Sequence, residues 1–192
     1  SSTSRGLGDV YKRQAEGFEA GGHNGREETT TLCLIPNVKR QINIPLIAAG
    51  GIGTGSQILA AFALGADGVQ IGSRFAATQE SSANQAFKDV IVNAQEGDTQ
   101  LTLKELAPVR LIKNDFYNQV QEKYQQGTTA EELKELLGRG RSKKGMFEGD
   151  LVNGELEIGQ VSSLIDSIPT VAEVFDDLLV DYQTAKDKLI RL

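Results

Sequence analysis

Short apolar runs that stop at glycine alternate with a helical pattern in the first half of the chain. Residues 46–49 form a continuous apolar run that ends at a glycine pair, and residues 68–75 contain a second one that ends at Gly72. Such runs are typical of strands buried on both faces of a parallel sheet. Between them, residues 56–66 are apolar nearly all round and reach Gly65, which indicates a buried helix with a glycine stop. Strand, helix and strand in this order predict parallel strands with a helical crossover.

Helical patterns dominate most of the remaining chain. Residues 29–42 have helical spacing, and we expect Pro36 in the first turn of that helix. One later segment, 101–114, has a mixed, strand-like pattern, and 141–160 is rich in loops. Helices are predicted over 81–95, 114–127, 129–138 and 168–189.

These patterns divide the chain into three parts. Residues 1–14 are polar, have no period and resemble a translated cloning adaptor, so we interpret them as a non-native leader. Residues 15–78 hold the parallel strands and glycine loops. Residues 79–192 form a mainly helical region, and since no low-complexity linker precedes it, we expect it to pack on the strands.

Composition narrows the range of functions. The 192 residues carry a net charge of −6, which argues against a nucleic-acid partner, and no apolar run approaches the ~20 residues of a membrane span. The single cysteine, Cys33, lies in an apolar run and is expected to be a small core residue in a cytoplasmic protein. With one cysteine and one histidine, no metal site is expected. The short basic cluster at 138–145 is interpreted as a solvated or anion-contacting loop.

Three glycine-rich loops carry the candidate chemistry. They read EAGGH at 19–23, AAGGIGTG at 48–55 and QIGS at 70–73. In a parallel α/β fold, loops that follow the strands lie on one face, at the carboxyl ends of the strands. Backbone N–H groups of such loops bind phosphate well. Gly51 and Gly72 are separated by 21 positions, a spacing that resembles the phosphate site after strands seven and eight of (β/α)8 barrels.

Two longer motifs make the resemblance specific. EGFEAGGHNG (16–25) and PLIAAGGIGTGSQILAAFALGADGVQIGSRF (45–75) resemble the nitronate monooxygenase family and its close relative, the flavin-dependent enoyl-[acyl-carrier-protein] reductase. The resemblance runs from about residue 15 to the C-terminus and includes the late motif EGD…NGELEIGQ. It implies an α/β fold, the C-terminal part of a TIM-like (β/α)8 barrel with an added helical region, and bound FMN.

The resemblance also implies roles for individual residues. The only histidine, His23, corresponds to the base beside the flavin ring. An ordinary imidazole, with a pKa near 6.5, accepts a proton at neutral pH. The positions implied to bind FMN are Gly17 and Gly22 at the flavin, Gly51 at its phosphate, and Gln70, Ile71, Gly72 and Ser73 completing the phosphate cradle.

The implied reaction is the FMN-dependent oxidation of a nitronate or nitroalkane by O2, which yields a carbonyl compound and nitrite. The expected assembly is a homodimer. The enoyl reductase is the main alternative; it would use the same FMN site with NAD(P)H. A barrel similar to IMP dehydrogenase shares the glycine pattern but needs a catalytic cysteine on a loop, whereas Cys33 lies in a helical pattern.

Length sets a further expectation. A TIM barrel typically has about 250 residues, and the first half of the family's barrel is absent from this sequence. We therefore expect the chain to be a C-terminal fragment. A truncated barrel with no activity of its own is another interpretation.

Overall fold

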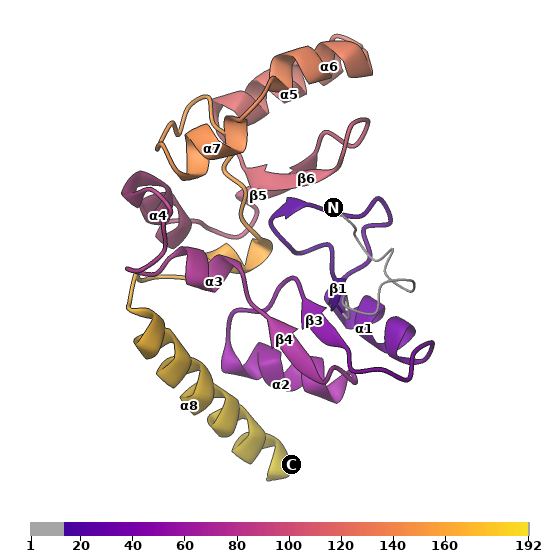
Figure 1. Cartoon of the computed structure of the whole chain (residues 1–192), viewed down its shortest axis with the longest axis vertical. Coiled ribbons are helices and arrows are strands. Elements are labelled where there is room, and N and C mark those ends of the chain that lie inside the picture. Colours follow the sequence, from indigo (N-terminus) through magenta and orange to yellow (C-terminus); the bar gives the residue numbers. More distant parts are fainter. Residues whose placement is uncertain (1–13, 192) are drawn as a thin grey trace.

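Two three-stranded sheets organise the protein (Figure 1). A computed structural model describes residues 14–191. The first sheet has the order β1-β3-β4, with all neighbours parallel, and consists of β1 (Gln14–Glu16), β3 (Ile47–Ala49) and β4 (Gly68–Gln70). The second has the order β2-β6-β5, with antiparallel neighbours, and consists of β2 (Gly22–His23), β6 (Val109–Ile112) and β5 (Thr99–Thr102).

Helices join and cover these sheets. The crossovers of the parallel sheet are α1 (Thr31–Lys39) and α2 (Gly55–Ala63). The helices after β4 are α3 (Ser73–Ala76), α4 (Gln85–Val92), α5 (Asp115–Gln125), α6 (Ala130–Leu137), α7 (Arg141–Met146), the 3₁₀ helix η2 (Gln160–Leu164) and α8 (Val171–Ile190). Figure 1 shows α5 and α6 over the hairpin β5–β6, while α1 and α2 lie beside the parallel sheet.

The β3–α2–β4 unit forms for local reasons. Thr54 accepts a hydrogen bond from the backbone N–H of Gln57, whose side chain reaches back to the N–H of Thr54. This capping box satisfies orphan donors at the helix start. The helix stops at Gly65, whose φ of +103° is the left-handed conformation that glycine adopts without strain. The predicted strand–helix–strand unit and its parallel strands are confirmed.

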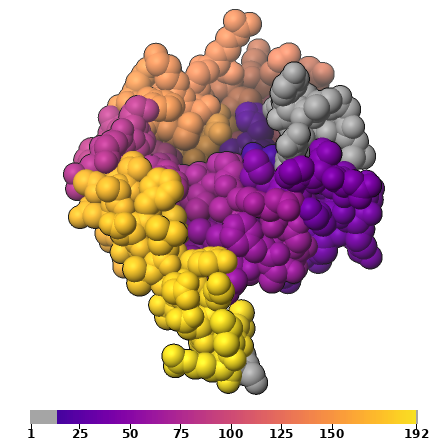
Figure 2. All heavy atoms as spheres, turned by 60° about the horizontal axis from the view of Figure 1, so that its bottom comes forward, coloured from indigo at the N-terminus to yellow at the C-terminus, as the bar shows by residue number. Residues whose placement is uncertain are grey.

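Helix α8 packs along α2 through a close backbone approach. Gly55 at the start of α2 lies so near Leu178 and Tyr182 of α8 that a Cβ there would overlap their backbone atoms. The carboxylate of Asp181 also accepts a hydrogen bond of 2.8 Å from the N–H of Ser56, at the positive end of α2. Figure 2 shows α8 lying against α2, with its C-terminal part extending past the rest of the molecule.

Three apolar clusters hold the elements together. One lies between the parallel sheet and helices α1 and α2, and includes Ile35 and Ala48. A second joins α4 to residues 156–165, and a third fills the space between the hairpin, α5 and α6. The region after residue 79 therefore combines helices with a hairpin, and its residues 156–165 return to the glycine loops, where Gln160 N–H bonds the Glu19 carbonyl at 2.9 Å.

Several local predictions are wrong. Cys33 is exposed, because α1 turns Thr31 and Ile35 toward the sheet and Cys33 lies two positions away from either. Pro36 is the sixth residue of α1, not a residue of its first turn. The strand at 46–49 is not buried on both faces as predicted, because Ile47 is 37% exposed. Helix α2 is not buried all round, since its Phe62 is also 37% exposed.

Gln14, the last residue of the interpreted leader, is the first residue of β1 and pairs with Ile47. Residues 1–13 of that leader lie outside the described part of the chain. In that described part, no helix combines the length and the apolar character that crossing a membrane requires.

Candidate functional site

All three glycine loops meet at one cavity of about 320 Å³, which we call the glycine cavity. Its wall is formed by the ends of the parallel strands and by residues 157–161, which fold back over them. The size falls within the range of small-molecule and cofactor sites. The lining residues that come from the loops are Ala20, Gly21, Gly22, Gly50, Gly51, Ile52, Gln70, Gly72 and Ser73.

Backbone shape at the second loop requires glycine. Gly50 and Gly51 follow β3 with φ of +89° and +69°, a conformation that strains other residues. A Cβ on Gly50 would lie 2.6 Å from the carbonyl oxygen of Gly17, and one on Gly51 would lie 3.1 Å from the Cβ of Glu19. The first two loops are thus in direct contact, and the cavity is lined there by bare main chain.

Ser73 presents a hydroxyl at the third loop. Its Oγ accepts a 3.0 Å hydrogen bond from the N–H of Gly159, which leaves the hydroxyl proton for another acceptor. Gly72 precedes it, and a Cβ on Gly72 would meet only the Gln70 amide, at 3.6 Å. A ligand phosphate could therefore approach this stretch closely.

A buried arginine fixes the loop that carries the histidine. Arg110 on β6 is 2% exposed, and its guanidinium donates from Nε (3.2 Å) and Nη2 (3.1 Å) to the Phe18 carbonyl. The guanidinium also stacks on the Phe18 ring, 4.5 Å from its centroid, while the Arg110 main chain pairs with Gly22. One residue thus holds the loop at both ends. Burial lowers the pKa of this guanidinium.

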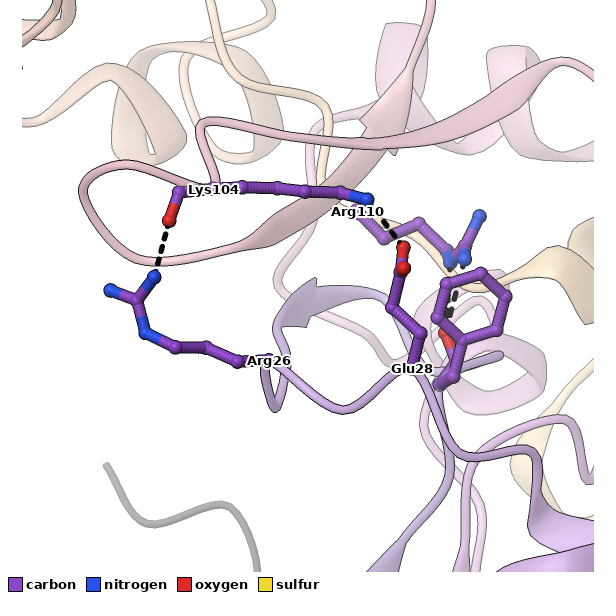
Figure 3. A network of polar contacts seen from close by, with 5 residues as sticks. Arg26, Glu28, Lys104 and Arg110 are labelled. Carbon is purple, nitrogen blue, oxygen red and sulfur yellow. Dashed lines mark hydrogen bonds and ion pairs between the residues drawn. The ribbon is translucent and has the colours of Figure 1, made fainter.

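A second set of contacts fixes the C-terminal half of the same loop, residues 24–28 (Figure 3). Arg26 donates to the carbonyl oxygens of Lys104 (2.6 Å) and Leu106 (3.0 Å), and Lys104 forms a 2.6 Å ion pair with Glu28. Asn24, itself buried, donates to two carbonyl groups within the loop. The hairpin β5–β6 therefore acts as the support on which residues 18–28 are held.

His23 directly follows Gly22, which lines the glycine cavity, but His23 itself lines a different cavity. It is exposed on β2 and forms part of the wall of a smaller cavity of about 130 Å³, between the hairpin and the α6–α7 connection. Gly22, one residue earlier, lines the larger glycine cavity.

Carboxyl groups lie at both cavities. Glu16 and Glu157 line the glycine cavity, and the Glu157 carboxylate is within 2.6 Å of where a Cβ on Gly22 would stand. Burial raises the pKa of Glu16. Glu155 lines the smaller cavity and is 7% exposed; burial, together with the charge of Glu157, raises its pKa to about 7.

The residues expected to bind FMN do not all reach the cavity. Gly17 instead packs tightly against Thr31 at the start of α1, and Ile71 packs on the cluster below the parallel sheet. The members that do line the glycine cavity are Gly22, Gly51, Gln70, Gly72 and Ser73.

Sequence reasoning missed Glu16, Met146 and Glu157, which also line the glycine cavity. Glu16 begins the EGFEAGGHNG motif and Glu157 lies in NGELEIGQ, so both motifs contain a carboxyl group of the cavity wall, but the glycine pattern by itself points to neither residue. A second hollow of about 500 Å³ also has Gly51 in its wall, but it is not lined by residues of the third loop.

The family model and the curated relatives carry the same description. The model of a family described as nitronate monooxygenase matches residues 14–181. A probable nitronate monooxygenase of Staphylococcus saprophyticus is 41% identical over 118 residues, which cover 56% of this chain and 33% of that protein. Another from Staphylococcus haemolyticus is 44% identical over 97 residues, covering 46% and 27%.

Solved structures match over most of the chain. FabK from Thermotoga maritima superimposes with a TM-score of 0.85 at 40% identity, covering 92% of this chain and 55% of that one. A nitroalkane oxidase from Streptomyces ansochromogenes gives a TM-score of 0.72 at 28% identity, covering 92% and 52%. The chain thus spans about a third of the length of the first curated relative and about half of these solved structures. An α/β fold that forms part of a TIM-like barrel is confirmed.

Proposed function

Because the chain belongs to the nitronate monooxygenase family, we propose that it takes part in the FMN-dependent oxidation of nitronates and nitroalkanes to a carbonyl compound and nitrite. One observation carries the proposal: three glycine loops meet at a single cavity, and His23 directly follows a residue of its wall. When bound, FMN supplies the redox chemistry that takes electrons from the nitronate and passes them to O2.

The residues of the cavity fit the phosphate end of FMN. The bare main chain at Gly51 and Gly72 allows close approach, and the free hydroxyl proton of Ser73 can be donated to a phosphate oxygen. The carboxyl of Glu16 lines the same cavity, where burial raises its pKa and so makes the charged form less favourable than it is in water.

His23 provides the proton-accepting group. Its imidazole is exposed at the edge of the smaller cavity, so that a substrate can reach it, and its backbone is paired with Val109 in the hairpin sheet. The imidazole would take the α-proton of a neutral nitroalkane and leave the nitronate. An already ionised nitronate does not need this step.

That difference defines the experiment. In the full-length protein loaded with FMN, His23→Asn should lower turnover of the neutral nitroalkane by ~10²–10⁴-fold, the usual contribution of a general base. Turnover of the preformed nitronate should fall far less. Stopped-flow reduction of the flavin by each form of one nitroalkane measures both. Equal losses on the two forms would show that His23 positions the substrate instead, and no loss on either would remove it from the mechanism.

An enoyl-acyl-carrier-protein reductase is the second candidate. The motifs are shared with that branch of the superfamily, and the chain superimposes better on FabK than on the nitroalkane oxidase. NAD(P)H oxidation distinguishes the two candidates. Rapid oxidation of NAD(P)H that depends on an enoyl thioester, without oxidation of any nitroalkane, would favour the reductase.

A further inference from the structure

Residues 157–161, which we call the strap, touch all three glycine loops. The main chain of the strap packs so closely on the first loop that a Cβ on Gly21 would overlap it. Val161 reaches the second loop, where a Cβ on Gly53 would lie 2.8 Å from the Val161 Cγ2. The third loop is reached through a hydrogen bond. The position of the strap is therefore set by the same loops that form the glycine cavity.

Two hydrogen bonds join the middle of the strap to the loops within the described part of the chain. The N–H of Gly159 donates to the Oγ of Ser73 over 3.0 Å, and the N–H of Gln160 donates to the carbonyl oxygen of Glu19 over 2.9 Å. The preceding residue on the N-terminal flank is anchored separately, because the carbonyl oxygen of Leu156 accepts a 2.9 Å bond from β6. Loss of the two loop bonds would thus release the middle of the strap while this flank stays attached.

The hydroxyl of Ser73 can serve the strap and a ligand at the same time. A serine hydroxyl has two acceptor lone pairs and one proton. One lone pair takes the N–H of Gly159, and Ser73 also lines the glycine cavity, so its proton is available to a phosphate oxygen there. A hydroxyl that donates to an anion becomes a better acceptor, because hydrogen bonds in a chain strengthen one another. A phosphate would therefore tighten the bond that holds Gly159.

We propose that Ser73 is a positioning residue that couples the strap to the cofactor: a phosphate bound to its hydroxyl holds the strap closed, and the closed strap slows release of the flavin. This inference rests on the proposed function, because it takes FMN as the occupant of the glycine cavity. The strap supplies Glu157, Ile158 and Val161 to the cavity wall, so its displacement opens the cavity. By thermodynamic linkage, strap closure and phosphate binding favour each other by the same factor.

Gly159 allows the coupling to be tested from the side of the strap. It is not one of the residues that line the glycine cavity, and its φ of −80° suits any residue, so an added methyl group acts through contact alone. A Cβ there would lie 2.9 Å from both the Glu19 carbonyl oxygen and the Ser73 Oγ, which is too close for either. Gly159→Ala should therefore lift the strap although the variant keeps the Ser73 hydroxyl.

Hydrogen exchange of the full-length apoprotein tests the coupling with two ligands that differ only in the phosphate. FMN should slow exchange in peptides that cover 157–161 by about tenfold, within the usual range of coupling between sites. Riboflavin at the same occupancy has no phosphate and should slow it little. In Ser73→Ala the two ligands should have the same small effect. Ser167→Ala, which removes an exposed hydroxyl bonded to Asp166, should behave as the wild type does.

Release of FMN, followed by its fluorescence, measures the coupling in the opposite direction. Gly159→Ala should speed release by about tenfold. Gly68→Ala is the matched control, because a Cβ there meets only the Ile47 side chain, at 3.7 Å, and it should leave the release rate unchanged. Combining Ser73→Ala with Gly159→Ala should release FMN little faster than Ser73→Ala alone, since the coupling passes through one hydroxyl. Losses that multiply in the double variant would overturn the coupling.

The outcomes separate the coupling from the proposed function. If FMN slows exchange of the strap through Ser73 but no nitroalkane is oxidised, the proposed function fails and the coupling stands. If nitroalkanes are oxidised but FMN and riboflavin protect the strap equally, or Ser73→Ala leaves their difference unchanged, the coupling is refuted and the proposed function stands. A full-length protein that binds no FMN refutes both.

Discussion

Replacing Arg110 by methionine should loosen the glycine loop more than the rest of the protein. The guanidinium makes two hydrogen bonds to the Phe18 carbonyl and one of 3.3 Å to Thr99, and it stacks on the Phe18 ring. Hydrogen bonds to a charged group contribute about 1.5–3 kcal/mol each and a desolvated cation–π contact about 2 kcal/mol. Among the described residues no carboxylate lies within ion-pair distance of this guanidinium, and the cost of burying such a cation offsets much of this sum.

We therefore expect a net loss of about 2 kcal/mol, concentrated on residues 18–24. This free energy corresponds to an opening equilibrium about 30-fold more favourable. Amide hydrogen exchange measures it directly: in Arg110→Met the amides of the loop should exchange about 30-fold faster, while those of α2 and α8 change little. Arg110→Lys keeps the charge but loses the forked donors, so the exchange rates of its loop amides should lie between those of the wild type and those of Arg110→Met.

The neighbouring core residue provides the control. Leu111 is fully buried in the cluster that involves α5 and α6, and Leu111→Ala should cost about 2–5 kcal/mol of overall stability. It should not accelerate exchange in the loop selectively. If Arg110→Met shows the same uniform change as Leu111→Ala, or no change in the loop, the guanidinium does not hold the loop and the reasoning is wrong.

Three further outcomes are expected. Gly51→Val should weaken FMN binding, measured by fluorescence titration of the full-length apoprotein, because its φ of +69° disfavours any side chain and a Cβ there would lie 3.1 Å from the Cβ of Glu19, so that the loop in the cavity wall would have to shift; unchanged affinity would place the cofactor elsewhere. Glu155→Gln should remove a pH effect. The folded carboxyl, with a pKa of about 7 against 4.5, stabilises the fold at low pH. Relative to the variant, the wild type should lose of the order of 3 kcal/mol in urea unfolding as the pH rises from 4.5 to above 7, and parallel curves would contradict this. Gly55→Ala should lower the melting temperature despite alanine's better helix propensity, since its Cβ would overlap the backbone of α8; a higher melting temperature would mean that α8 does not press on this glycine.

Local sequence determined the elements that form from short-range rules. The glycine stops at Gly51 and Gly65 and the apolar run of β3 predict a strand–helix–strand unit, because each depends on neighbours within a few residues. The capping box that the structure shows at Thr54 is equally local. The convergence of the three glycine loops also followed from sequence, since parallel strands place their carboxyl ends on one face. The family could also be predicted from sequence, because the two long glycine-containing motifs at 16–25 and 45–75 are continuous segments of the chain.

Tertiary structure alone decided what fills the space around those loops. Nothing in the local pattern of residues 109–112 shows that Arg110 would be buried against Phe18, ninety-two positions away, because a charged residue in a strand pattern is normally placed at the surface. Exposure of Cys33 likewise depends on which side of α1 meets the sheet. The separation of His23 from the glycine cavity, and the return of Glu155 and Glu157 to the two cavities, are fixed by packing between distant segments. Such packing is set by the shapes of both partners, so it is not encoded in the pattern of either one.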